Sequence, residues 1–281
     1  MKNVLFYGNC QLFAIKEILN LPIKKFNISY VECFTTNISE LDFKKLIIKS
    51  DIIICNPIQT KYREKNYLGT DFILKNVKIH CAIIIIESCY FNGYYPDLSY
   101  HSINNQLLKE PIDYHYKTMI SYYKNGKSEE EFINEVVENE NFYNKEYLED
   151  NVNKSLHELK IRCDNNKKKF LQQRNVFILS IWEFIKDNYK NKLLFYSMNH
   201  PTNILLQFIV EQIFKIMNIR NLKREFRLEI DPLNNPKCLI YKGIQKIVNF
   251  DLNKHEPLMK NKSNLREITK LYFETYNKVN L

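Results

Sequence analysis

A cysteine stands at the first sharp corner of the chain. An apolar run at residues 4–7 ends at Gly8, and after Asn9 and Cys10 the pattern becomes helical. A thiol in the first turn of a helix lies beside free backbone N–H groups and the positive end of the helix dipole, so we expect a lowered pKa and a reactive thiolate. The same groups would stabilise an oxyanion, to which Asn9 could donate. The alternative is a small structural cysteine beside a turn glycine.

A histidine occupies a second corner, after another short apolar run at residues 193–198. It belongs to the sequence Asn199-His200-Pro201, and the proline suits the start of the helical pattern that follows. If both apolar runs are strands of one sheet, His200 and Cys10 share a sheet edge and can form a nucleophile–base pair. The alternative is a capping or hydrogen-bonded structural histidine.

A third group of polar and aromatic side chains follows the strongest strand pattern of the sequence. Tyrosines, carboxylates and imidazoles hydrogen-bond sugar hydroxyls, and aromatic faces stack on sugar rings. The alternative is a packing loop rich in aromatic residues. The candidates for sugar contact are Tyr95, Asp97, His101 and His115.

The elements that position these residues alternate between strand and helix over residues 1–90. The runs "DIIIC" at 51–55 and "KIHCAIIIIE" at 78–87 are continuously apolar, which is typical of strands buried on both faces of a parallel sheet. We therefore predict an α/β fold with a mostly parallel, doubly wound sheet, similar to that of flavodoxin, in which residues 193–198 form a late strand.

The middle of the chain has a different sequence pattern. Residues 101–191 are charged and helical in pattern, and Ile178, Ile181, Trp182 and Ile185 have the spacing of one helix face. We predict a single α/β domain over residues 1–281 with a helical insertion at about 101–191.

Composition narrows the classes of partner. The formal net charge of +9 favours anionic ligands, but the basic residues are scattered and no nucleic-acid-binding motif occurs, so we expect no nucleic-acid partner. A phosphorylated cofactor suits this charge, and the Arg220–Arg227 cluster either is a solvated basic face or holds the phosphates of such a cofactor. The sequence has neither GxGxxG nor Walker A motifs, which excludes the usual dinucleotide and P-loop sites.

Cysteine usage indicates the compartment. The seven cysteines are scattered without any CxxC pair, so we predict neither a disulfide framework nor a metal site. Apolar stretches are too short to span a membrane, and the N-terminal residues do not resemble a signal peptide. We expect a cytoplasmic protein without a transmembrane segment.

Four motifs in order, GNCQ, YYPD with a later YH, DYHY and NHPTN, resemble the WcbI-type family of polysaccharide biosynthesis, which is associated with acetyl transfer in bacterial capsule assembly. The resemblance runs from about residue 2 to residue 217 and more weakly to the end. It implies an α/β fold distantly similar to SGNH hydrolases and acyltransferases, and a binding site for coenzyme A. It places Gly8-Asn9-Cys10 where SGNH enzymes have Gly-Asp-Ser, and His200-Pro201 where they have the base. Ser197 stands at the position of the usual acid, so no complete triad is visible.

The resemblance implies a coenzyme A-dependent O-acyltransferase that moves an acyl group, most simply acetyl from acetyl-coenzyme A, to a sugar hydroxyl in capsular or surface polysaccharide synthesis. His200 would be the general base, and Cys10 would either carry the acyl group or form an oxyanion site with Asn9. Other polysaccharide-assembly enzymes would be its partners. We assign contact with coenzyme A to Gly8, Gln11, Asn199 and Asn203.

Two alternatives stay open. An SGNH-like carbohydrate esterase or deacetylase would use the same residues with water as the acceptor. A non-catalytic protein that binds a glycan or a nucleotide sugar within an assembly complex would explain the incomplete triad.

Overall fold

The computed structural model describes residues 1–19, 25–170, 172–219 and 230–281. The chain divides into two compact units, which are described separately here. The first comprises Met1–Cys89, Glu158–Phe184 and Asn203–Pro232, and the second comprises Tyr90–His157, Ile185–Thr202 and Leu233–Leu281. The predicted insertion at 101–191 is thus divided between the two units, because residues 158–184 belong to the first.

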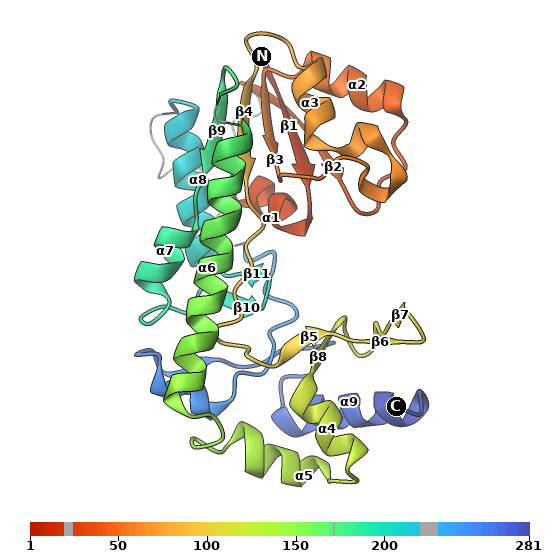
Figure 1. Cartoon of the computed structure of the whole chain (residues 1–281), viewed down its shortest axis with the longest axis vertical. Helices are drawn as coiled ribbons and strands as arrows, with labels where there is room; N and C mark the ends of the chain where they lie inside the picture. Colours follow the sequence, from red (N-terminus) through yellow and green to blue (C-terminus); the bar gives the residue numbers. More distant parts are fainter. Residues whose placement is uncertain (20–24, 171, 220–229) are drawn as a thin grey trace. The chain divides into compact units, whose positions relative to one another are not determined.

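A five-stranded parallel sheet forms the centre of the first unit (Figure 1). Its strand order is β2-β1-β3-β4-β9, and each neighbouring pair is parallel. This confirms the predicted doubly wound sheet, since the order is that of flavodoxin-like folds. The strands are β1 (Lys2–Gly8), β2 (Phe26–Glu32), β3 (Ile52–Cys55), β4 (Ala82–Ile86) and β9 (Val176–Leu179).

Helices cover both faces of this sheet because successive side chains of each strand point to opposite faces. Leu5 and Tyr7 of β1 belong to a core that also contains apolar residues of three helices, α2 (Glu40–Lys49), α3 (Thr70–Asn76) and the last turn of α6 (Lys145–Phe170). Val4 and Phe6 point the other way and are also buried. Helix α1 (Cys10–Ile18) contacts β1 and packs against α8 (Asn203–Ile216), which contacts β9.

Two predictions about the late strands are wrong. The fifth strand of the sheet is β9, which lies within the stretch that we assigned to a helix face. The prediction was wrong because a short apolar run of four residues fits both the repeat of a helix and that of a strand. Residues of the predicted late strand form β10 (Phe195–Ser197), which pairs antiparallel with β11 (His200–Pro201) outside the central sheet. The expected common sheet edge for Cys10 and His200 is therefore absent among the described strands.

The second unit is built from short hairpins and helices around an aromatic core. Strand β5 (Leu98–Tyr100) pairs with β8 (Tyr114–Tyr116), and β6 (Ser102–Ile103) pairs with β7 (Gln106–Leu107). Its other helical elements, besides the start of α6 and the end of α7 (Trp182–Asn188), are α4 (Lys117–Lys124), α5 (Glu129–Phe132), η3 (Ile133–Val137), η5 (Lys242–Lys246), η6 (Leu252–Lys254) and α9 (Leu265–Lys278).

Local sequence signals explain several helix starts. Ser39 caps α2 by accepting from the Asp42 amide, and Ser128 forms a complete capping box with Glu131 at the start of α5. Two short 3-10 turns, η1 (Tyr62–Glu64) and η2 (Asn66–Leu68), connect β3 to α3 in the first unit. Within the described ranges, no helix has the length and apolar character needed to cross a bilayer.

Glu87 is a buried carboxyl at the carboxyl end of β4. Its side chain has 3% relative exposure, and neither oxygen has a hydrogen-bond partner of good geometry among the described residues. Burial raises the pKa of Glu87 to about 7, although the Ile181 backbone and the Arg162 guanidinium act in the opposite direction. A large fraction of the folded protein therefore keeps this carboxyl protonated at neutral pH.

The raised pKa of Glu87 predicts a loss of stability with rising pH. Between about pH 4.5 and pH 7 the folded state keeps a proton that the unfolded state releases, so the free energy of unfolding falls by about 3 kcal/mol at most. The variant Glu87→Gln has no carboxyl to titrate at this position, so its stability should not show this fall. The difference in the free energy of unfolding between variant and wild type should therefore shift in favour of the variant as the pH rises. Urea unfolding of both proteins at either end of the window measures the difference. A pH dependence that is the same in both proteins would contradict this account of Glu87.

Candidate functional site

The predicted corner between the first strand and the first helix is confirmed. Strand β1 ends at Gly8, Asn9 is the N-cap, and α1 begins at Cys10. The Asn9 side chain has two roles: Oδ1 accepts from the Gln11 amide at 3.0 Å, and Nδ2 donates to Ser88 Oγ at 3.2 Å. The start of α1 is therefore fixed to the segment that follows β4.

Asn56 is a site residue that the sequence analysis missed. It follows β3 directly, it is buried, and its Oδ1 accepts from the Asn9 amide at 3.0 Å while its Nδ2 donates to the Ile86 carbonyl at 2.8 Å. A Cβ atom on Gly8 would lie 2.2 Å from this Oδ1, so only glycine leaves room for the Asn56 side chain. A polar amide directly after a continuously apolar strand is the signal that could have identified it.

Gln11 links the same helix to the segment after β4. Its side chain is buried, with Nε2 donating to the Cys89 carbonyl and Oε1 accepting from the Cys89 amide, both at 2.8 Å. This paired arrangement gives Gln11 a structural role. Contact of Gly8 and Gln11 with coenzyme A stays a prediction.

The expected low pKa of Cys10 is wrong in its direction. Burial is the largest cause and raises the pKa of the Cys10 thiol above its usual value, and the nearby Glu32 carboxylate raises it further. The backbone amides of Cys10 and Gln11 lower it, as a helix N-terminus should, but they are outweighed. Cys10 is therefore mostly a neutral thiol at neutral pH.

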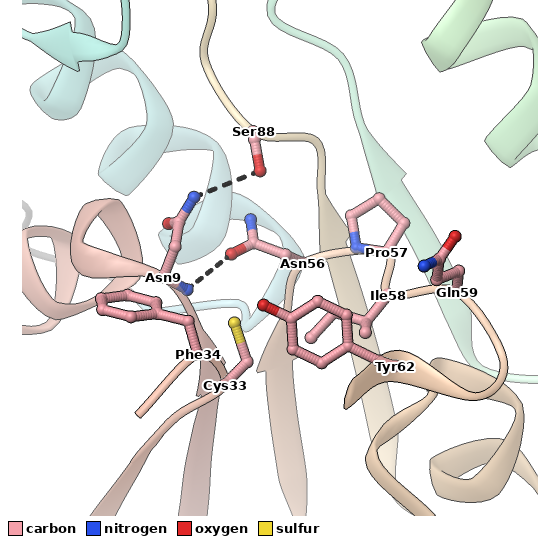
Figure 2. A pocket seen from close by; sticks show the side chains of 9 residues that line it. All are labelled: Asn9, Cys33, Phe34, Asn56, Pro57, Ile58, Gln59, Tyr62 and Ser88. Carbon is pink, nitrogen blue, oxygen red and sulfur yellow. Dashed lines mark hydrogen bonds between the residues drawn. The ribbon is translucent and has the colours of Figure 1, made fainter. Parts of the chain in front are cut away.

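A pocket of about 380 Å³ lies at the carboxyl edge of the sheet in the first unit (Figure 2). It is lined by residues that follow four adjacent strands: Asn9 after β1, Cys33 and Phe34 after β2, Asn56, Pro57, Ile58, Gln59 and Tyr62 after β3, and Ser88 after β4. In a sheet of this order, connections leave β1 and β3 toward opposite faces, and the crevice between their carboxyl ends is the usual ligand site. The volume is within the range of roughly 300–1,000 Å³ that is common for small-molecule sites.

His200 belongs to β11 of the second unit. Its Nδ1 is buried without a hydrogen-bond partner among the described residues, and its ring is nearly perpendicular to that of Tyr114, with centroids 5.9 Å apart. Burial lowers the pKa of His200 to about 4, although the Leu233 backbone opposes this. The imidazole is therefore neutral at neutral pH, which is the form that accepts a proton.

Asn199 is anchored beside His200. Its Oδ1 accepts from the Tyr114 hydroxyl at 2.7 Å and from Ser197 Oγ at 3.2 Å, and its Nδ2 donates to the Tyr100 hydroxyl at 3.2 Å. Ser197, at the position of the usual triad acid, is thus buried and oriented toward an amide. Contact of Asn199 with coenzyme A stays a prediction.

Tyr95 and Asp97, two of the predicted sugar ligands, are buried in the core of the second unit. The Tyr95 hydroxyl donates to the Phe195 carbonyl at 3.0 Å. Asp97 accepts from the Thr118 amide at 3.2 Å and from the Tyr241 hydroxyl at 3.0 Å, while burial raises its pKa. These contacts give both residues structural roles, and contact with a sugar stays a prediction.

His115 is fully buried and His101 is only partly so. The ring of His115 bonds the Tyr276 hydroxyl at 3.1 Å and the Leu108 carbonyl at 3.2 Å, and burial lowers its pKa to about 4. The two imidazole centroids are 6.1 Å apart. Here too, sugar contact stays a prediction.

The remaining predicted contacts belong to different parts of the chain. Asn203 begins α8 in the first unit, where its Nδ2 donates to the Ile230 carbonyl. The Arg220–Arg227 cluster lies outside the described residues. Because Cys10 and His200 belong to different units, their pairing stays a prediction. No group of three or more histidine, cysteine, aspartate or glutamate residues that could hold a metal ion occurs in the described part of the chain.

Comparison with known proteins identifies the family. The family model described as polysaccharide biosynthesis enzyme WcbI matches residues 3–222. A solved structure of WcbI, described as a novel polysaccharide biosynthesis enzyme in its native form without a disulfide bond between coenzyme A and one of its cysteines, has the same fold. The TM-score is 0.82 at 19% identity, covering 99% of this chain and 90% of that one. No curated protein matches the chain. The chain therefore belongs to the WcbI family of polysaccharide biosynthesis enzymes.

Proposed function

We propose that this protein is a coenzyme A-dependent acyltransferase that transfers an acetyl group to a sugar hydroxyl during capsular or surface polysaccharide synthesis. The observation that carries this proposal is the corner at Asn9 and Cys10, which stands at the ligand edge of the sheet beside a pocket. The family's role in polysaccharide synthesis supports a sugar acceptor. The solved WcbI structure, whose description relates coenzyme A to a cysteine of that protein, supports the donor.

The charges at the candidate residues favour direct transfer. His200 is neutral and can take the proton of the sugar hydroxyl, whose oxygen then attacks the thioester carbonyl. The C–O bond of the ester forms, the C–S bond breaks, and the proton passes from His200 to the departing thiolate of coenzyme A. Cys10 is a poor nucleophile because its pKa is raised, so its place is in the oxyanion corner with Asn9.

The state of the cysteines supports a cellular compartment for this reaction. All seven cysteines are unpaired, which agrees with a reducing compartment, and we place the reaction in the cytoplasm together with other polysaccharide-assembly enzymes.

Thermal unfolding with coenzyme A and acetyl-coenzyme A tests the donor. A ligand at a hundredfold excess over its Kd stabilises the native state by about 2.7 kcal/mol, so for a chain of 281 residues we expect a saturable rise in Tm of roughly 5 °C. The variant His200→Asn should keep this rise but lose acetyl transfer by about 100-fold or more, whereas His157→Asn, an exposed histidine on α6, should keep both. Absence of any rise would refute coenzyme A as a ligand, and full activity of His200→Asn would refute its role as the base.

The pH dependence of alkylation tests the state of Cys10. Because the other six cysteines are buried, iodoacetamide should label Cys10 first in the folded protein. The rate should keep rising beyond pH 9, since burial and Glu32 raise the thiol pKa above its ordinary value of 9.0. Mass spectrometry of the labelled peptide measures the rate, and Cys10→Ser is the control for labelling elsewhere. A rate that reaches its plateau below about pH 8 would show a reactive thiolate and restore covalent acyl transfer through Cys10.

A further inference from the structure

We propose that the pocket at the carboxyl edge of the first unit binds the ring of an uncharged pyranose, which is the acyl acceptor of the proposed reaction. This inference rests on the proposed function only where it calls the sugar the acyl acceptor. That the pocket binds a sugar is argued from the pocket's own geometry. It differs from the sugar contacts predicted from sequence, because none of those four residues lines this pocket.

The first argument is the position of the pocket relative to the reacting corner. Asn9 lines the pocket, immediately precedes Cys10, and caps the helix that Cys10 begins. A group in the pocket is therefore at the reacting end of the site. The adenine and phosphates of coenzyme A lie a full pantetheine arm away from its thioester, so they do not belong here.

The second argument is the chemistry of the lining. None of the nine described residues that line the pocket carries a charged side chain. Amides and a hydroxyl supply the polar groups instead: the Asn9 and Asn56 amides lie together near Ser88, and Gln59 extends at the rim (Figure 2). Ser88 Oγ accepts from Asn9, so the Ser88 hydroxyl proton is available for a sugar hydroxyl, and the second hydrogen of Asn9 Nδ2 is left for the oxyanion of the proposed reaction. Such groups match sugar hydroxyls.

The third argument is the pair of aromatic side chains. Phe34 is 45% exposed in the turn that follows β2, and the Tyr62 hydroxyl points toward the Cys33 sulfur (Figure 2). Aromatic faces are electron-rich and attract the C–H face of a pyranose. The two segments are fixed to each other, since Arg63 donates to the Thr36 carbonyl at 2.9 Å.

The backbone that carries Tyr62 is strained. Lys61, Arg63 and Glu64 have φ values of 61°, 51° and 59°, in the left-handed region that residues with side chains seldom adopt. Left-handed residues of this kind gather at ligand clamps, where the surrounding contacts hold them in place. This strain is explained if the segment must present Tyr62 to a ligand.

The charged groups around the pocket bear on whether it takes a neutral or an anionic sugar. The Glu32 carboxylate acts on the Cys10, Tyr30 and Cys33 side chains, all of which it disfavours as anions. Arg63, next to Tyr62, has the opposite effect on the Tyr62 hydroxyl, but none of the described lining residues is a cation that could pair with a uronate. A neutral pyranose should therefore bind better than a uronic acid.

Titration of the isotope-labelled full chain with methyl pyranosides, followed by NMR, tests the pocket. Methyl glycosides of neutral hexoses should bind saturably, and the methyl glycoside of glucuronic acid should bind more weakly. The variants Phe34→Ala and Gln59→Ala should each raise the Kd for the neutral glycosides roughly five-fold. Phe177→Ala is the matched control, since Phe177 is 40% exposed on β9 and does not line the pocket, and it should leave the Kd unchanged.

Coenzyme A, titrated into the same variants, separates this proposal from the proposed function. Its affinity should be unchanged by Phe34→Ala. Loss of coenzyme A affinity in that variant without saturable binding of any neutral glycoside would assign the pocket to the donor and overturn the proposal, as would tighter binding of the glucuronide. If neutral glycosides bind with the expected variant effects but coenzyme A does not bind wild type, the sugar pocket stands and acyl transfer fails.

Discussion

The side-chain amide of Asn56 holds the ends of three neighbouring strands together. It accepts from the backbone after β1, belongs to the backbone after β3, and donates to the last residue of β4. A buried amide that loses such partners costs about 1–3 kcal/mol for each unsatisfied group. Gly8 makes the arrangement sterically possible, and Asn9 then caps α1 and contacts Ser88. The position of Cys10, and the shape of the pocket beside it, both depend on this one hydrogen-bonded amide.

The aromatic richness of the chain has two different uses. In the second unit, tyrosine hydroxyls satisfy buried partners: Tyr95 donates to a carbonyl, Tyr241 to Asp97, and Tyr272 to the Tyr114 carbonyl. Such residues supply large apolar area and a polar tip, and this unit uses both for its core. In the first unit Phe34 remains exposed at a pocket rim. Composition alone could not separate these uses, because burial is decided by packing between distant segments.

Local patterns in the sequence predicted the sheet and the first corner, because the signals for β1, β3, β4 and the Asn9 cap are contained within a few residues. They failed where the outcome depended on distant residues. The four residues of β9 are too few to show whether their apolar positions repeat as in a strand or as in a helix. The helical spacing of the apolar residues from Ile178 to Ile185 therefore led to a helix prediction. The pKa of Cys10 depends on burial and on Glu32, a residue of another strand, and neither is visible at the corner itself. Asn56 does have a local signal, its position directly after the apolar strand β3, but its partners Asn9 and Ile86 are distant in the sequence.

The two candidate reacting groups are both uncharged at neutral pH, although by opposite shifts. Burial raises the pKa of the Cys10 thiol and lowers the pKa of the His200 imidazole, because in each case a low dielectric disfavours the ion. A thiolate–imidazolium pair, on which covalent catalysis by cysteine depends, is therefore disfavoured in the ground state. Charge would develop only as the hydroxyl attacks the thioester, when the proton moves to the imidazole and the carbonyl oxygen becomes anionic. In the proposed reaction the Asn9 side chain would face this oxygen, and it is already held in place by the Gln11 amide and by Ser88, so it would need little reorganisation.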